Sequence, residues 1–551
     1  MIVAGALVAL AVTGGYALQG GGGKRRTPGP LARLSVVLGR PTDVSITASV
    51  LSSTDFEAYL EIGTSPGIYT RKTPAATVKA NEPREVEVTG LAADTQYYYR
   101  LVTHSTGDAA ATKGSECRFH TARKPGSAFV FDVQGDSHPE REDKMYNPEL
   151  YMSNLKSVAA EHPDFYIMLG DDFSIENLLG HLSQSAVDAV YAGQRSFVGQ
   201  AANSAALFLV NGNHEQAGRH WLDDTPNNPA VMAGLARTHF YPLPAPGGFY
   251  SGDKEQVKHI GLLRDYYAFT WGDALFVVID PYWHSPIGVD DGRTGKYDPA
   301  TVQEIRGGAG GKGGNNQSGG KGTNGGNVNG AGEENKEDNA QEPGQGNGLP
   351  GSGGRGRKKG QKGGGGGKGA RDMWQITLGD DQYHWLEKTL TGSHAKYKFV
   401  FAHHVLGTGR GGVEVAKLYE WGGQDRRGND VFKQMRPTWS LPIHQLFVKS
   451  GVTAFFQGHD HIYCHQELDG VVYQSTPNPA DDTYTAFNSE AYQSGKQLPN
   501  SGHLRVKVAP EGVTVSYIRA FFPKDENGTQ KNGMTADTYT IKPGSAQKPV
   551  K

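Results

Sequence analysis

The chain has 551 residues, which is too long for one ordinary domain and enough to bury a large core. Its 55 Lys and Arg nearly balance its 57 Asp and Glu, so no field of one sign would draw the whole protein onto nucleic acid or an anionic membrane. Only two cysteines are present, Cys117 and Cys464, which excludes a disulfide framework and a thiolate-rich metal site. We expect two isolated thiols, with a single remote bridge as the alternative. Glycine, with 76 residues, is about twice as frequent as usual, which indicates that some segment is not globular.

Residues 1–31 begin with an uncharged, mostly apolar run from Met1 to Leu18, and the basic residues 24–26 follow it. The run is as long as a signal-peptide core and barely reaches the roughly 20 residues of a membrane span. Because the basic residues come after the run, it fits a signal anchor better than a cleaved signal; a mis-chosen start codon would also explain it. We predict a signal peptide or membrane anchor plus linker, and therefore an exported protein that is periplasmic, secreted or on the cell surface.

Residues 32–123 have the alternating pattern of a small β-sandwich. Short runs rich in Val, Ile, Thr and Tyr are separated by Gly, Pro, Asp and Asn, as expected for strands and turns. The phrase from Gly90 to Arg100 resembles the fibronectin type III family, in which a Leu and a Tyr before the sixth strand pack into the core. The expected strands are Ser45–Ser49, Phe56–Ile62, Glu85–Val88, Tyr97–Val102 and Cys117–His120.

Residues 127–522 have a different pattern, in which apolar runs end abruptly in polar residues. Continuous apolar runs are typical of strands buried on both faces. Helical segments such as Pro148–Glu161 and Asp380–Leu390 lie between them. This is an α/β arrangement, in which ligands bind at the carboxyl ends of strands. The expected buried strands are residues 128–133, 165–169, 206–210, 275–279, 398–402 and 452–456.

A Gly-rich insertion, residues 307–370, interrupts this domain. It has almost no side chain that could enter a core, so we predict a disordered surface loop whose ends lie close together. Its glycines lack the strand–loop–helix setting of a phosphate-binding loop. The basic residues 355–359 could touch nucleic acid or an anionic polymer, but an inert insertion is favoured and we expect no specific nucleic acid partner. Residues 523–551 are predicted to form an irregular C-terminal tail.

Five polar blocks each close an apolar run. A lone Asp-x-His or His-x-His at a strand end is usually a hydrogen-bonding or surface feature, but five such blocks predict a metal site. Carboxylates, imidazoles and an amide without a thiolate suit manganese, iron, zinc or cobalt better than calcium. The blocks are Gly135-Asp136-Ser137-His138, Gly170-Asp171-Asp172, Gly212-Asn213-His214-Glu215, Ala402-His403-His404 and Gly458-His459-Asp460-His461.

The ordered blocks resemble the calcineurin-like metallophosphoesterase superfamily, whose pattern is Asp-x-His, Gly-Asp, Gly-Asn-His-Asp/Glu, His and Gly-His-x-His. The resemblance covers residues 128 to about 480 and implies an α/β fold, a four-layer double β-sandwich flanked by helices. It also implies two divalent or trivalent metal ions. The first would be held by Asp136, His138 and His461 and the second by Asn213, His403 and His459, with Asp171 bridging them.

The resemblance also bears on the neighbours of these residues. The family places its fourth-block ligand directly after a short strand and a small residue, which favours His403 over His404. His404 would then face the substrate or pack. His214 is expected not to bind metal but to steady the phosphate and protonate the leaving group. Glu215 or Asp172 could orient an imidazole, or be an acid at the surface or a helix cap.

A β-sandwich in front of such a domain also resembles purple acid phosphatases, but the chain departs from them at two positions. Those enzymes carry a tyrosine ligand three residues after the bridging Asp, where this chain has Ser174. They also lack the His of the first block, where this chain has His138. The tyrosinate colour of those enzymes is therefore not expected here, and a ferric ion is not implied.

The resulting hypothesis is a metal-dependent phosphoric ester hydrolase, in which a hydroxide held by two metals attacks a phosphomonoester in line. A phosphodiesterase on the same scaffold is the first alternative, because the metal core is shared and the pocket walls decide. A non-catalytic surface binding protein with a vestigial metal site is the second. The complete ligand set argues against it.

Overall fold

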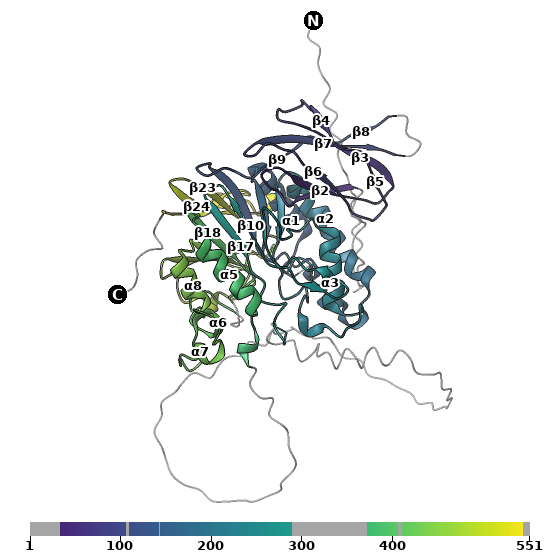
Figure 1. Ribbon diagram of the computed structural model, residues 1–551. Helices are drawn as coiled ribbons and strands as arrows, with labels where there is room; N and C mark the ends of the chain where they lie inside the picture. The colour runs from purple at the N-terminus through teal and green to yellow at the C-terminus, as the bar shows by residue number, and fades with distance from the viewer. Residues whose placement is uncertain (1–33, 106–109, 143, 289–371, 406–409, 544–551) are drawn as a thin grey trace, which may run out of the picture. The chain divides into compact units, whose positions relative to one another are not determined.

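The computed structural model describes residues 34–105, 110–142, 144–288, 372–405 and 410–543 (Figure 1). The predicted signal or anchor segment and the predicted disordered insertion at 307–370 lie outside these residues. Within them, no helix combines the length and the apolar character needed to cross a membrane.

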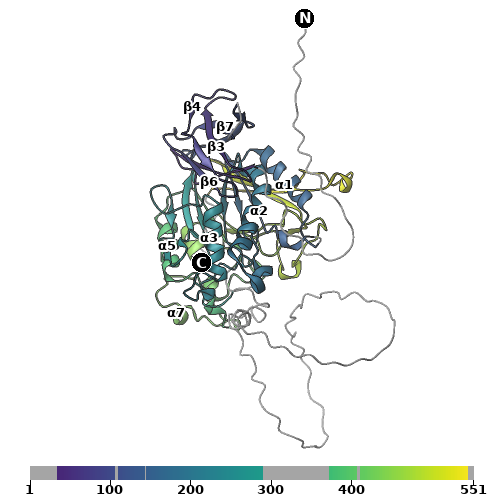
Figure 2. The same ribbon diagram turned by 90° about the vertical axis from the view of Figure 1, so that its right-hand side faces the viewer.

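The N-terminal region forms two small antiparallel sheets (Figures 1 and 2). All five strands expected there are present, within a few residues of the expected ends. Apolar side chains of both sheets, such as Val50, Leu60 and Tyr99, belong to one buried cluster. One sheet contains β1 (Leu34–Gly39), β2 (Ile46–Ser52) and β6 (Arg84–Val88). The other contains β3 (Phe56–Gly63), β4 (Arg71–Lys72), β5 (Ala76–Val78), β7 (Gln96–His104), β8 (Thr112–Lys113) and β9 (Cys117–His120).

Two larger sheets make up the rest of the fold. The first has the order β12-β11-β10-β23-β24-β25. Its strands are β10 (Phe129–Gln134), β11 (Phe165–Met168), β12 (Ala206–Leu209), β23 (Gly502–Ala509), β24 (Gly512–Arg519) and β25 (Thr535–Ile541). The second has the order β13-β16-β17-β18-β19-β21-β20-β22. Its strands are β13 (Ser251–Gly252), β16 (Tyr267–Trp271), β17 (Ala274–Val278), β18 (Tyr397–Phe401), β19 (Ala454–Gln457), β20 (Tyr463–Leu468), β21 (Val471–Ser475) and β22 (Lys496–Leu498). A separate hairpin pairs β14 (Gln256–Val257) with β15 (Gly261–Leu262).

The two larger sheets face each other across an aromatic core. Phe131 of the first sheet meets Phe276 of the second with ring centroids 5.0 Å apart, and Phe165 meets the same ring at 5.1 Å. Helices cover the outer faces (Figure 1): α1 (Pro148–Glu161), α2 (Gln184–Ala202) and α3 (Pro229–Phe240) on the first sheet, and α5 (Asp380–Gly392), α6 (Tyr419–Gly422), α7 (Phe432–Met435) and α8 (Ile443–Ser450) on the second. The predicted four-layer α/β fold, a double β-sandwich flanked by helices, is therefore confirmed.

Both helices named from the sequence are present. Helix α1 spans the predicted residues, because the Asn147 side chain accepts the backbone N–H groups of Glu149 and Leu150 and Pro148 occupies the first turn. His162 ends the helix in the left-handed conformation. Helix α5 runs two residues beyond its predicted end, to Gly392.

The C-terminal prediction is wrong in one stretch. Residues 523–551 were expected to be irregular, but β25 pairs antiparallel with β24 at the edge of the first sheet. Its sequence, TADTYTI, is rich in Thr, and its half-buried Tyr539 donates to Gln474 Oε1 at 2.9 Å. An otherwise open sheet edge and one packed face make this polar stretch a strand. Cys117 and Cys464 are both free thiols.

Candidate metal centre

The candidate centre lies where strands of both larger sheets end. Strands β10, β11 and β12 are parallel neighbours in the first sheet, and β18 and β19 are parallel neighbours in the second. Each of the five polar blocks follows one of these strands, so all of them meet at the same edge of the double sandwich. All seven residues predicted as ligands come together there.

The loops that carry these residues are conformationally unusual. His138, Asp171, His459 and His461 have positive φ angles between 49° and 67°. Few residues other than glycine adopt this left-handed region, and each instance costs about 1–3 kcal/mol unless the surroundings enforce it. Four such residues in one cluster indicate that the surrounding structure holds these side chains in place at a cost in folding stability.

One half of the centre contains Asp136, His138 and His461. Asp136 Oδ2 lies 3.1 Å from His461 Nε2 and 3.8 Å from His138 Nε2, while Asp136 Oδ1 accepts the backbone N–H of His459 at 2.7 Å. All three side chains are buried. One ligand atom from each lies within 4.8 Å of the others, a spacing that could hold a metal ion.

The other half contains Asn213, His403 and His459. Asn213 Oδ1 lies 3.0 Å from His403 Nε2 and 3.1 Å from His459 Nδ1, and these two ring nitrogens are 3.2 Å apart. An amide oxygen and two imidazole nitrogens therefore converge on one point.

Asp171 stands between the two halves. Its Oδ2 lies 3.1 Å from His403 Nε2 and 3.5 Å from His138 Nε2, and its Oδ1 accepts the backbone N–H of His214 at 2.8 Å. Burial opposes ionisation of Asp171, but His403 and His214 outweigh it and hold the pKa well below its usual range. An ionised carboxylate that faces both halves is suited to bridge two cations.

The donor set fits metal ions. Burial, followed by Arg141, lowers the pKa of His138, and burial, followed by Arg410, lowers that of His459, so both imidazoles are neutral as ligands must be. His403 directs Nδ1 to the Leu169 carbonyl at 2.9 Å and so turns Nε2 towards Asp171. Burial opposes a proton on His403, but Asp171 and Asp136 raise its pKa to about 10. The carboxylates around His403 thus attract positive charge, which a divalent cation supplies as well as a proton.

The geometry favours His403 over His404 as the fourth-block ligand. His404 is buried, and its Nδ1 lies 2.9 Å from the hydroxyl of Tyr282. Its Nε2 has no hydrogen-bond partner among the described residues, and its ring lies 4.9 Å from that of His459. Burial and His403 lower the pKa of His404 to about 3, so the ring is neutral.

His214 lies beside the centre and contacts two residues that the sequence patterns did not single out. Its Nδ1 is 2.7 Å from Glu176 Oε2, its Nε2 is 3.1 Å from Arg141 Nη2, and the same Nε2 is 3.9 Å from Asp171 Oδ2. Burial lowers the pKa of His214, but Asp171 and Glu176 outweigh it and raise it to about 9. The two carboxylates therefore favour a proton on His214, and the contact with Glu176 fixes the position of its ring.

Acidic residues do orient imidazoles here, but not the two that were expected. Glu140 Oε1 lies 2.8 Å from His138 Nδ1, and Glu176 holds His214. Glu215 instead accepts backbone N–H groups of Gly212 and of residues 171–173, at 2.8 to 3.1 Å. Asp172 accepts the Ser137 hydroxyl at 2.6 Å. The suggestion that Glu215 or Asp172 orients an imidazole is therefore wrong, because both accept hydrogen bonds from the loops instead. Neither is a surface acid, since both are buried.

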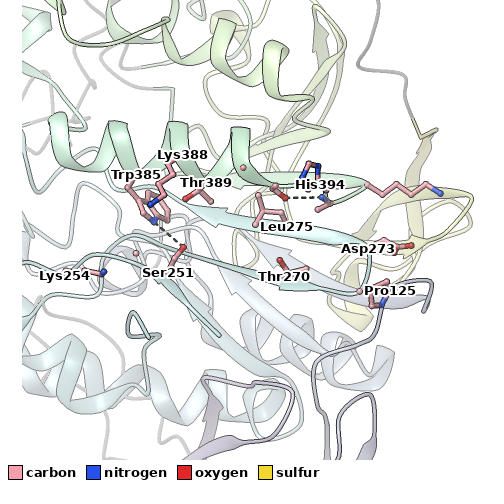
Figure 3. Close-up of a pocket in the computed structure, with 16 residues that line it drawn as sticks. Pro125, Ser251, Lys254, Thr270, Asp273, Leu275, Trp385, Lys388, Thr389 and His394 are labelled. Carbon is pink, nitrogen blue, oxygen red and sulfur yellow. Dashed lines mark hydrogen bonds between the residues drawn. The ribbon is translucent and has the colours of Figure 1, made fainter. Parts of the chain in front are cut away.

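A groove of about 870 Å³ lies elsewhere, between α5 and the strands β13, β16 and β17. Trp385, Lys388 and Ser251 lie towards one end of it and Asp273 towards the other, and Trp385 Nε1 donates to Ser251 Oγ at 3.3 Å (Figure 3). Asp273 immediately precedes β17, whereas the metal centre follows the other ends of the strands. None of the predicted ligands lines this groove.

Solved structures share this architecture. A purple acid phosphatase, PPD1 from yellow lupin (Lupinus luteus) seeds, has 14% sequence identity and a TM-score of 0.51, over 92% of this chain and 74% of that one. The structure of PhoD has 12% identity and a TM-score of 0.56, over 93% of this chain and 90% of that one. The chain has the calcineurin-like metallophosphoesterase fold. No family model matches the sequence, and no curated protein matches it.

Ser174, three residues after Asp171, is buried. It occupies the position of the tyrosine expected from the resemblance to purple acid phosphatases. Its hydroxyl has no hydrogen-bond partner among the described residues. Tyr282 is the tyrosine that contacts the histidines of the fourth block, and its hydroxyl is directed to His404. The buried His and Asp groups of the centre could hold metal ions.

Proposed function

We propose that this chain is a metal-dependent phosphoric ester hydrolase that acts on phosphomonoesters. The observation that carries the proposal is the position of Asp171, whose Oδ2 lies within 3.5 Å of ring nitrogens from both halves of the centre. The fold supports the same class of reaction, because the structures of a purple acid phosphatase and of PhoD share it.

Two metal ions, drawn from manganese, iron, zinc and cobalt, would be the cofactors. Asp136, His138 and His461 would hold the first ion. Asn213, His403 and His459 would hold the second, and Asp171 would contact both. Bound there, such ions supply Lewis acidity towards phosphoryl oxygens and lower the pKa of water.

The residues around the ions would position the phosphate ester and move protons. Arg141, whose guanidinium lies beside His214, supplies positive charge for the phosphoryl oxygens. His214 carries a proton on the same side of the centre, and Glu176 fixes its ring, so we assign it the protonation of the leaving oxygen. With the Tyr282 hydroxyl donating to Nδ1, His404 would present Nε2–H to the substrate from the opposite side.

Paired substrates test this proposal. The metal-loaded protein is assayed with p-nitrophenyl phosphate and with bis-p-nitrophenyl phosphate, and its metal content is measured on the same sample. We expect two catalytic ions, removed together by Asp171→Asn, and faster turnover of the monoester. A preference for the diester would make the chain a phosphodiesterase. Metals without turnover of either substrate would leave only a binding role, and the proposal would be wrong.

The same preparation tests the departure from purple acid phosphatases. Because Ser174 and not a tyrosine follows Asp171, the iron-loaded protein should show no tyrosinate-to-iron charge-transfer band in its visible spectrum. A purple colour would indicate a tyrosine ligand and would contradict the ligand assignment. Its loss in Tyr282→Phe would identify Tyr282 as that ligand, and its survival would point to another tyrosine.

A further inference from the structure

A second group of metal-binding side chains lies outside the candidate centre. Asp132, Glu161 and His503 each offer one ligand atom, and these atoms lie within 4.8 Å of one another. Asp132 and His503 are fully buried, and the Glu161 side chain is 8% exposed. We call these three residues the α1 cluster.

The strand alternation explains how the α1 cluster forms. In β10, Phe131 and Val133 enter the core between the two sheets, so Asp132 points to the opposite face, which α1 covers. In β23, Leu504 and Val506 belong to the same core, so His503 also points to the face under α1. Glu161 is the last residue of α1. Two strands and a helix end, far apart in sequence, thus deliver one ligand each.

The side chains of the cluster are not satisfied by one another. Neither carboxylate oxygen of Asp132 has a hydrogen-bond partner among the described residues, and neither does His503 Nε2. His503 Nε2 lies 3.5 Å from Glu161 Oε2. Burying a carboxylate without a partner is unfavourable, so such a group normally binds a proton, a cation or a metal.

The charge of the surroundings favours a cation. Arg505 lies opposite Asp132 in the β10–β23 register, but its guanidinium forms a two-pronged ion pair with Glu161. That pair is neutral as a whole, so it offers Asp132 little compensating positive charge. Burial, followed by repulsion from Glu161, raises the pKa of Asp132 well above its usual range. Arg505 lowers the pKa of Asp132 less than burial and Glu161 raise it, so an ionised Asp132 needs a further positive charge beside it.

His503 is already oriented as a metal ligand. Its Nδ1 lies 2.9 Å from the side-chain oxygen of Asn154, which accepts the Nδ1 proton. The lone pair of Nε2 then points towards the carboxylates. A histidine whose other ring nitrogen donates to an oxygen is the usual arrangement at metal sites, because that bond fixes the tautomer and the ring plane.

We propose that Asp132, Glu161 and His503 bind one divalent transition-metal ion that joins the end of α1 to β10 and β23. Two carboxylates and one imidazole suit Zn²⁺ and similar ions better than Ca²⁺ or Mg²⁺, which prefer all-oxygen shells. Arg505 closes the cluster on its solvent side, so the ion stabilises the fold and takes no part in ester hydrolysis. The proposal does not depend on the proposed function.

The test is a count of bound ions in the full chain. Each protein is loaded with Zn²⁺, freed of excess by gel filtration over a weak chelator, and analysed by mass spectrometry of the metal. We expect Asp132→Asn and His503→Gln to hold one ion fewer than the unchanged chain. Asp171→Asn, which removes the carboxylate shared by the two halves of the catalytic centre, should retain one ion. Adding Asp132→Asn to Asp171→Asn should remove that last ion.

His444→Gln is the matched control. His444 is also buried and also faces a carboxylate, but both of its ring nitrogens have partners, at 2.9 Å to Asp469 and 2.8 Å to the Tyr473 hydroxyl. Its replacement should leave the ion count unchanged. The melting temperature of the Asp171→Asn protein should rise with added Zn²⁺ only while Asp132 is present.

Equal ion counts in the unchanged chain and in Asp132→Asn would overturn the proposal, and the α1 cluster would then hold a proton. If both cluster variants failed to fold, the Asp171→Asn protein alone would decide, because its α1 cluster is intact. An Asp171→Asn protein without any ion would contradict the α1 site. One that kept both catalytic ions would contradict the proposed function instead.

Discussion

At the scale of the residue, Asp171 is the side chain that links the two halves of the candidate centre. The first prediction follows from this position. Asp171→Asn replaces the shared negative charge by a neutral amide of the same shape. Two cations held close together then repel each other without compensation, so we expect both to be lost together. Metal analysis after gel filtration measures this, and retention of two tightly bound ions would contradict the bridging role.

Asp172→Asn is the control for that variant, because the two residues are adjacent and equally buried. Burial raises the pKa of Asp172 well above its usual range, so its surroundings favour a neutral side chain such as Asn. Its Oδ1 accepts from Ser137 and from Gln134 at 2.6 and 2.8 Å, and an Asn oxygen can do the same. The metal content should therefore stay as it is in the unchanged chain.

His214 provides the second prediction. Its ring comes no closer to Asp171 than 3.9 Å and is held by Glu176, and the backbone N–H that Asp171 accepts is kept in any variant, so His214→Gln should leave the metal content intact. A positioned acid contributes about 10²–10⁴-fold to a proton-transfer step, so kcat should fall in that range. The loss should be larger for an alkyl phosphate than for p-nitrophenyl phosphate, whose leaving group needs little protonation. An equal loss for both substrates would indicate that His214 only positions the phosphate.

At the scale of the element, the loops after β11 and β12 are packed closely enough that a methyl group has no room. A Cβ added at Gly212 would lie 2.2 Å from Asp171 Oδ1 and 2.3 Å from the Asp171 backbone nitrogen. The third prediction is that Gly212→Ala moves Asp171, lowers the metal affinity by about 10–100-fold and destabilises the fold by about 1–3 kcal/mol. Metal titration and urea unfolding measure the two effects.

Gly193→Ala, in α2, is the control for this substitution. Nothing lies within 4 Å of the added Cβ there. Because alanine is the better helix former, the variant should be more stable by about 0.5–1 kcal/mol and should bind metal unchanged. If Gly212→Ala behaved in the same way, the close approach of the two loops would not matter for the centre.

Most of the strands, and the ligands that follow them, could be predicted from the sequence. The strands that end in polar blocks were predictable, because a buried strand is a continuous apolar run and its first polar residue marks its end. All seven predicted ligands lie together for that reason. Strand β25 was missed because its polar Thr-rich sequence becomes a strand only beside the open edge of β24.

The residues that orient the imidazoles were not predictable in this way. Glu140, Arg141 and Glu176 lie in or beside short 3₁₀ turns, where an acidic or basic side chain normally faces water. Only the folded chain turns Glu176 towards His214, which is 38 positions away in the numbering, and buries it. Local patterns hold no information about such a contact, because it depends on how β11 and β12 lie side by side.

At the scale of the whole molecule, the small β-sheets are joined to the metallophosphoesterase region through α2 and the residue after it. The Tyr99 hydroxyl of β7 donates to the Asn203 carbonyl at 2.6 Å. Arg195 of α2 is fully buried and donates to Ser35 Oγ at 3.2 Å, to Ser49 Oγ at 2.9 Å and to the Ser49 carbonyl at 2.7 Å. It also donates to the Phe240 carbonyl, so one guanidinium serves β1, β2 and the end of α3.

The fourth prediction concerns this guanidinium. Burial lowers the pKa of Arg195 to about 10, so it remains charged at neutral pH, and only neutral oxygens accept from it in these bonds. Arg195→Met keeps an unbranched apolar stem but removes the guanidinium, which leaves the Ser49 and Phe240 carbonyls without this donor. Each buried unsatisfied acceptor costs about 1–3 kcal/mol, so the variant should lose ~3 kcal/mol in urea unfolding followed by circular dichroism. Turnover and metal content of the folded protein should not change, because Arg195 contacts no residue of the centre.

Arg71→Met separates this effect from the general loss of an arginine. Arg71 also donates to two backbone carbonyls, at 3.1 Å to Gly90 and 2.8 Å to Thr89, but it is exposed and lies within the small sheets alone. Water can replace its hydrogen bonds, so the variant should lose no more than about 0.5 kcal/mol. A comparable loss in both variants would mean that the Arg195 contacts do not couple the two regions. The opposite outcome would be a large loss confined to Arg195→Met, with the small sheets and the metallophosphoesterase region unfolding in one transition before the change and in two after it. That outcome would show that Arg195 makes the two regions a single cooperative unit.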